Sequence, residues 1–167
     1  MTAARTMISF SVGATRFNYR TAAIAIRNGH VLVCREDDDD YVMLPGGRVE
    51  MGEASDIALA REVAEELQST AVIQRLVFTA ENFFEHEGLS VHEIGTYYLI
   101  ELPPEFPFQT EGVVRETHDE GLRLQFSWVP IRGNALGEIN LRPRWMIERL
   151  RALPAAPTHL VLNEQHL

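Results

Sequence analysis

Residues 46–69 read GGRVEMGEASDIALAREVAEELQS. Within this stretch residues 55–67 contain neither glycine nor proline, and apolar side chains recur at helical spacing. The pattern predicts an amphipathic helix from Ser55 to Leu67, with Ser55 or a neighbour capping its N-terminus. The apolar stripe consists of Ile57, Ala60, Ala64 and Leu67, with Val63 beside it.

Three glutamates stand on the face opposite this stripe. Glu62, Glu65 and Glu66 occupy positions i, i+3 and i+4, so their like charges are crowded and each such pair costs a few tenths of a kcal/mol. A hard divalent cation would reverse that sign, because carboxylate and carbonyl oxygens suit Mg²⁺ or Mn²⁺. The bend at Gly46 and Gly47 would allow the backbone to approach closely. The residues alone leave open that this is an ordinary solvated acidic face.

The spacing around these glutamates is more specific than their charge. Five residues separate Gly47 from Glu53, and seven more precede the run Arg61-Glu62-Val63-Ala64-Glu65-Glu66. This pattern resembles the Nudix box, whose fixed positions all match through Glu66. Gln68 and Ser69 depart from it, standing where the family has glycine and an aliphatic residue. Because the glycine position suits a left-handed backbone, Gln68 is expected to cost about 1 kcal/mol or to shift the helix exit.

The resemblance implies both a fold and an activity. The expected fold is of the α+β class, a Nudix-type α/β/α sandwich with a mixed central sheet, one box helix and one C-terminal helix. The expected reaction is the hydrolysis of a pyrophosphate bond in a nucleoside diphosphate linked to another group, with Mg²⁺ or Mn²⁺ as cofactor. An acidic protein can bind such an anion because the metal bridges them.

Residue roles follow from the resemblance position by position. It implies catalysis by Glu62, Glu65 and Glu66, which would bind the metal together with the Gly46 carbonyl, and it makes Glu62 the first candidate for the general base. It assigns a structural role to Gly47 and to an ion pair between Glu53 and Arg61. Arg48 is a weaker candidate for a phosphate contact. Members of the MutT type have a further metal-binding glutamate just before a late tryptophan. In this chain Ser127 stands before Trp128, so that glutamate is absent, and Glu93, Glu116 and Glu120 are candidates for a further ligand or base.

Length, charge and composition limit the kind of protein that this chain can be. The chain has 167 residues, enough for one domain over 1–167, and its net charge of −9 disfavours binding to a nucleic-acid polymer. Cys34 is the only cysteine, and no apolar run approaches the roughly 20 residues that span a bilayer. These features favour a cytoplasmic protein that does not enter a membrane, and the resemblance implies that its partner is a small nucleotide.

The remaining segments predict mainly strands. Two hairpins are expected, one turning at Asn28-Gly29 and the other at Glu87-Gly88. Residues 103–121 are expected to be irregular, residues 122–129 to form a strand and residues 143–153 a second helix. The run Thr158–Leu162 can either complete the sheet of its own chain or pair with a second copy in a homodimer.

The sequence is compatible with two classes of function. The first is a diphosphohydrolase acting on a nucleoside triphosphate, a nucleotide-sugar or a related substrate, with triphosphates weakly preferred because the chain is small and carries no added domain. The second is a catalytically silent nucleotide-binding sensor with the same fold, which the presence of all four box glutamates disfavours.

Overall fold

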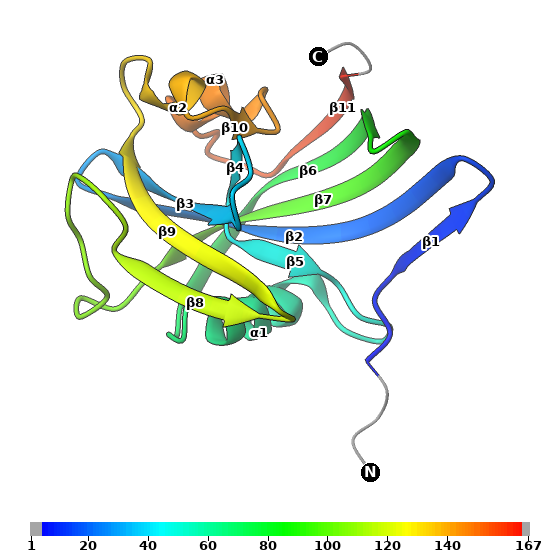
Figure 1. Cartoon of the computed structure of the whole chain (residues 1–167). Coiled ribbons are helices and arrows are strands. Elements are labelled where there is room, and N and C mark those ends of the chain that lie inside the picture. Colours follow the sequence, from blue (N-terminus) through cyan, green and yellow to red (C-terminus); the bar gives the residue numbers. More distant parts are fainter. Residues whose placement is uncertain (1–4, 165–167) are drawn as a thin grey trace.

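The computed structural model describes residues 5–164, and its main feature is a mixed β-sheet with an apolar core on each face (Figure 1). Three helices pack against this sheet. The strands are β1 (Ser9–Val12), β2 (Thr15–Arg27), β3 (His30–Glu36), β4 (Val42–Met43), β5 (Gly46–Arg48), β6 (Val72–His86), β7 (Leu89–Glu101), β8 (Arg115–Asp119), β9 (Leu122–Pro130), β10 (Leu141–Arg142) and β11 (Thr158–Glu164). The helices are α1 (Ser55–Glu66), α2 (Ala135–Glu138) and α3 (Met146–Leu150).

Strand β2 is the centre of the sheet. One edge pairs in parallel with β7, and the other edge is shared by β1, β5 and β3. The β3 pairing involves only Ile26 and Arg27, so β3 soon leaves β2 and pairs instead with β9 and β4. Figure 1 shows β8 and β9 on one side, β2, β6 and β7 extending away on the other, and α1 beside β5.

Both predicted hairpins are confirmed. The turn between β2 and β3 places Asn28 and Gly29 at φ 50° and 73°, and the turn between β6 and β7 places Glu87 and Gly88 at φ 50° and 77°. Two consecutive residues with positive φ match the right-handed twist of the flanking strands.

The alternation of β2 divides the core between the two faces. Ala22 and Ile24 face the cluster covered by α2 and α3, whereas Ala23 and Ala25 face the cluster that contains the apolar side of α1. Helices therefore cover both faces of one mixed sheet, as the predicted sandwich requires. No helix in residues 5–164 is both long and apolar enough to cross a membrane.

The C-terminal helix is shorter than predicted. The sequence pattern favoured residues 143–153, but α3 spans only Met146–Leu150, and a separate short helix, α2, was not predicted. Pro143 follows β10 directly, and Pro154 limits the other end, so little room remains for a regular helix.

The segment 103–121 is only partly irregular, which corrects the prediction. Residues 115–119 form β8, which pairs with β9 from Arg115↔Phe126 to Asp119↔Leu122. Three of the five residues of β8 are charged at neutral pH, so its strand conformation comes from pairing with β9 rather than from β-propensity.

The run Thr158–Leu162 completes the sheet of its own chain. It lies in β11, which pairs in parallel with β6 from Thr158↔Phe78 to Glu164↔Phe84. Of the two predicted alternatives, the structure therefore has the intramolecular one.

Candidate active site

Helix α1 buries two of its glutamates. Glu62 and Glu66 are only 7% and 8% exposed, whereas Glu65 is more open to solvent. The predicted apolar stripe was right only in part: Leu67 and the adjacent Val63 are buried, whereas Ile57 is 59% exposed and Ala60 and Ala64 also face solvent. Ala58 and Leu59 are buried in their place. Because small alanines occur on both sides, the apolar pattern could not choose between two overlapping faces, and burial of charged side chains was not expected.

The helix also begins without the predicted side-chain cap. Its N-cap residue is Ala54, whose side chain makes no capping hydrogen bond, and in the first turn the N–H of Ile57 donates to Oδ1 of the neighbouring Asp56 over 2.9 Å. The Ser55 hydroxyl instead lies 2.7 Å from the Tyr98 hydroxyl of β7. The start of α1 therefore depends on packing rather than on capping.

The two glycines of β5 let the backbone approach these glutamates. A Cβ atom at position 47 would lie 2.4 Å from Cδ of Glu62, and one at position 46 would lie 2.1 Å from the carbonyl oxygen of Thr21. Gly46 has φ 148°, and its N–H donates to Oε2 of Glu66 over 3.2 Å. A side chain at position 47 would therefore displace the carboxylate of Glu62, and one at position 46 would push β5 away from β2.

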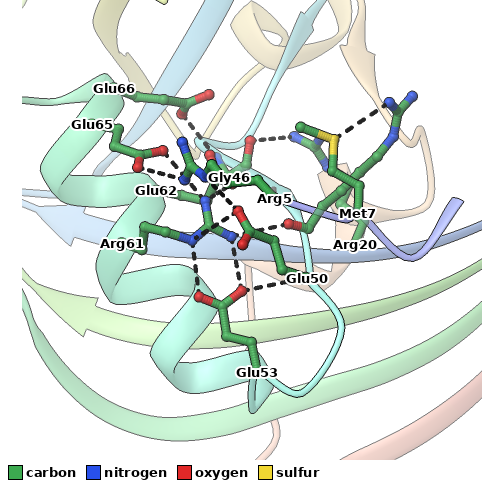
Figure 2. Close-up of polar contacts among 11 residues, drawn as sticks. Arg5, Met7, Arg20, Gly46, Glu50, Glu53, Arg61, Glu62, Glu65 and Glu66 are labelled. Carbon is green, nitrogen blue, oxygen red and sulfur yellow. Dashed lines mark hydrogen bonds and ion pairs between the residues drawn. The ribbon is translucent and has the colours of Figure 1, made fainter. Parts of the chain in front are cut away.

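Arg61 joins the loop before α1 to the helix (Figure 2). Its guanidinium donates to both carboxylate oxygens of Glu53, each over 2.9 Å, and to Oε1 of Glu62 over 2.6 Å. It also donates to the carbonyl of Arg48 over 3.2 Å. The hydrogen bonds from Arg61 hold the pKa of Glu53 below its usual value. The expected contact between Glu53 and Arg61 is thus present, and it fixes β5 relative to the carboxylates.

Burial makes the two inner glutamates reluctant to ionise. Burial raises the pKa of Glu66 to about 8, against the opposing charge of Arg20. Burial also raises the pKa of Glu62, although Arg61 opposes the shift. A bound cation would favour the ionised form of both carboxylates.

The C-terminal end of α1 is held by β8. Gln68 takes a left-handed conformation with φ 47°, the conformation that a glycine would adopt without strain. Arg115 donates to the carbonyls of Leu67 and Gln68 over 2.6 and 3.1 Å, and Thr117 donates to the carbonyl of Glu66 over 2.6 Å. The helix exit therefore keeps the backbone geometry that the box pattern requires.

The residues present suit a hard divalent cation by their chemistry. Glu62, Glu65 and Glu66 offer carboxylate oxygens, and the Gly46 carbonyl, which accepts a 3.2 Å hydrogen bond from Arg20, offers a further oxygen. Within residues 5–164, however, no three acidic, histidine or cysteine side chains are arranged to hold a metal, and Arg61 engages both Glu62 and Glu65. A cation bound here would therefore compete with Arg61 for Oε1 of Glu62 and Oε2 of Glu65.

A cavity of about 450 Å³ opens beside these groups. Its lining includes all three helix glutamates and Arg48, so the structure brings the predicted metal and phosphate residues together. Of the three further acidic candidates, Glu93 and Glu120 also line the cavity. Glu116 does not, and its carboxylate accepts a hydrogen bond from Gln125.

Sequence reasoning missed Asn18 and Arg142 of this cavity, offered Arg20 only as a vague option for a phosphate contact, and expected Arg16 to be exposed to solvent. Arg16, Asn18 and Arg20 line it from alternate positions of β2, and Arg142 lines it from β10. The alternation of polar side chains at the start of β2 was the available signal.

A second hollow of about 950 Å³ lies at the other end of β2 and is lined in part by Arg27 and Trp128. Arg27 already donates there to the carbonyls of Leu102, Pro103 and Phe106. The chemistry therefore favours the smaller cavity as the active site.

Comparison with known proteins agrees with this geometry. The family model for the NUDIX domain matches residues 17–150. None of the curated proteins matches the sequence. A crystal structure of a UDP-X diphosphatase has a TM-score of 0.58 at 16% identity, covering 90% of this chain and 69% of that one. The MutT protein from Methanosarcina mazei has a TM-score of 0.57 at 23% identity, with 84% and 96% covered. A NUDIX hydrolase from Nitrosomonas europaea has a TM-score of 0.56 at 20% identity, with 88% and 79% covered. At these identities the solved structures support the fold.

Proposed function

The chain belongs to the Nudix family, and on that premise we propose that it hydrolyses a pyrophosphate bond in a nucleoside diphosphate linked to another group, using Mg²⁺ or Mn²⁺. One observation carries this proposal. Two glutamates are almost fully buried at the wall of a 450 Å³ cavity, beside a glycine pair that leaves no room for a side chain. Buried carboxylates are costly unless a cation or a proton compensates them.

The proposed metal ligands are Glu62, Glu65, Glu66 and the carbonyl oxygen of Gly46. When bound, the metal would neutralise the diphosphate and lower the pKa of the attacking water. Glu62 is the proposed general base, because its carboxylate lies at the cavity wall, where it can accept the proton of that water. The hydrogen bond from Arg61 to Oε1 holds this carboxylate in position.

Arg48 is proposed to bind a substrate phosphate. Arg48 lines the cavity, and its guanidinium donates to Sδ of Met7 over 4.0 Å. Among the described residues no carboxylate forms an ion pair with it, so its donors are available for an anion. Arg61 and Glu53 act as positioning residues, because their ion pair holds the loop of Arg48 against α1.

The proposed substrates are small nucleotides, either nucleoside triphosphates or nucleotide-sugars and related compounds. The test is phosphate and pyrophosphate release from a panel of triphosphates, ADP-ribose, dinucleoside polyphosphates and nucleotide-sugars. Each compound is assayed with Mg²⁺, with Mn²⁺ and with excess EDTA. Turnover that requires the metal supports the proposal and identifies the substrate class.

The alternative is a nucleotide-binding sensor without catalysis. Metal-dependent nucleotide binding with no turnover on any member of the panel would favour that function and contradict hydrolysis of these substrates. The retained carboxylates Glu62, Glu65 and Glu66, which a silent site would not need, favour the enzyme.

A further inference from the structure

Three polar side chains form a row across the cavity floor, away from the helix carboxylates. Asn18 of β2 is the register partner of Glu93 of β7, and Glu93 is in turn the partner of Asn82 of β6. All three line the cavity. The two amides are 8% and 5% exposed, so this row is part of the protein interior and not a solvated edge.

The orientation of both amides is fixed from outside the row. Oδ1 of Asn18 accepts a hydrogen bond from the Ser9 hydroxyl over 2.7 Å, and Oδ1 of Asn82 accepts one from the Trp145 indole over 3.1 Å. Each amide therefore points its NH₂ group away from the donor that its Oδ1 atom contacts. Both side chains hydrogen-bond Glu93, which must be the acceptor in each case.

Glu93 keeps acceptor capacity after these two contacts. An ionised carboxylate has about four lone-pair sites, of which the amides use two. The other two are available to a ligand in the cavity that Glu93 lines. Burial raises the pKa of Glu93, against the opposing charges of Arg20 and Arg48 and the hydrogen bonds from the two amides, and the same two guanidinium groups repel a cation from this end of the cavity. A neutral ligand with N–H donors therefore fits better than a second cation.

The next row of the sheet offers an apolar surface. Val91 and Phe84 are register partners one row along from Glu93 and Asn82, and both line the cavity. A flat ring can lie against Phe84 while its edge reaches the carboxylate.

The distance from the metal ligands suits a nucleotide. Gly46 pairs with Ala22 at one edge of β2, and Glu93 pairs with Asn18 at the other edge. Gly46 and Glu93 are therefore separated by two strand spacings across the sheet and by the four residues from Asn18 to Ala22 along it. This amounts to roughly 16 Å between Cα atoms. An extended nucleoside diphosphate, with its contacts at each end, spans a comparable length.

We propose that Glu93, held by Asn18 and Asn82, recognises the base of the substrate and selects guanine. This inference rests on the proposed function, since it places a nucleotide across the cavity. Guanine alone among the common bases presents a ring N–H next to an amino group, which match the two free acceptor sites. Adenine and cytosine would place a ring acceptor against the carboxylate, and uracil would place carbonyl oxygens there.

The test compares the binding of α,β-methylene analogues of GDP, IDP and ADP by calorimetry in the presence of Mg²⁺. The inosine analogue lacks only the amino group of guanine. The wild-type protein is expected to bind the GDP analogue about tenfold to a hundredfold more tightly than either other analogue. Equal affinities would overturn the proposal without any variant.

Glu93→Gln tests the residue itself, and Glu116→Gln is the matched control outside the cavity. The first substitution is expected to reduce the preference for GDP over IDP to less than about threefold, and the control to preserve it. An unchanged preference in Glu93→Gln would overturn the proposal. Because these analogues resist cleavage, a guanine preference in a protein that hydrolyses nothing would refute the proposed function and still support the base site.

Discussion

Replacing Glu66 by glutamine should change how the stability of the metal-free protein depends on pH. Burial raises the pKa of this carboxyl from 4.5 to about 8 in the folded protein. Below pH 4.5 both the folded and the unfolded protein hold the proton. As the pH rises toward 8, only the unfolded chain releases it, so the free energy of unfolding decreases.

The size of this decrease follows from the two pKa values. Each pH unit between them corresponds to about 1.4 kcal/mol, so the full loss is about 5 kcal/mol, of which about 3.5 kcal/mol falls between pH 5 and pH 8. Glutamine carries no charge and its side-chain oxygen can still accept the N–H of Gly46. The variant should therefore keep the fold and lose this part of the pH dependence.

The assay is urea unfolding of both proteins in EDTA at pH 5, 6, 7 and 8. The variant is expected to be more stable at pH 8, with a difference that shrinks steadily toward pH 5. Glu62 is buried in both proteins, so its raised pKa contributes in both and largely cancels from the comparison. Adding Mn²⁺ at pH 8 should stabilise the wild type much more than the variant. Parallel stability curves for the two proteins would refute the reasoning about Glu66.

Three further substitutions test how α1 and its loop are held. Arg61→Ala should lower the free energy of unfolding by about 3 kcal/mol, because it leaves the mostly buried Glu53 and Glu62 without their partner. The control Arg123→Ala removes an exposed ion pair with Asp38 and should lower it by less than about 0.5 kcal/mol. Equal losses for the two variants in urea unfolding would contradict the role of Arg61. Gln68→Gly should raise the stability by about 1 kcal/mol, since φ is 47° at this position, and a lower melting temperature would show that the left-handed backbone is not strained. Ala54→Asp should add about 1 kcal/mol by supplying the missing N-cap acceptor, and thermal unfolding that is unchanged or destabilised would argue against an uncapped helix start.

Local signals in the sequence were enough for several elements. The Asn28-Gly29 pair predicted its hairpin because two positive φ values are needed there, and the box spacing placed Arg61 on Glu53 correctly. The β8 strand could not be predicted this way, since residues 115–119 are held by pairing with β9. The buried face of α1 was also missed, because hydrophobic periodicity assumes that glutamates such as Glu62 stay in solvent.

The floor of the cavity lay beyond sequence reasoning for a different reason. Asn18, Asn82 and Glu93 come from three strands, and only the register of β2, β7 and β6 brings them side by side. Register is set by the whole sheet rather than by any local pattern. Glu93 was a candidate on its charge alone, but nothing in the sequence indicated that two amides hold it.

The most direct test of the central claim is the steady-state rate of pyrophosphate-bond hydrolysis at pH 8 with saturating Mg²⁺, for the wild type, Glu66→Gln and Glu116→Gln. Since the glutamine variant is expected to be the more stable protein in this buffer without metal, a loss of turnover would report on chemistry and not on unfolding. We expect at least a hundredfold decrease for Glu66→Gln, equivalent to about 3 kcal/mol, and a rate within about twofold of wild type for Glu116→Gln. Equal rates for all three proteins would contradict the claim that the buried carboxylates of α1 form the metal site of a hydrolase.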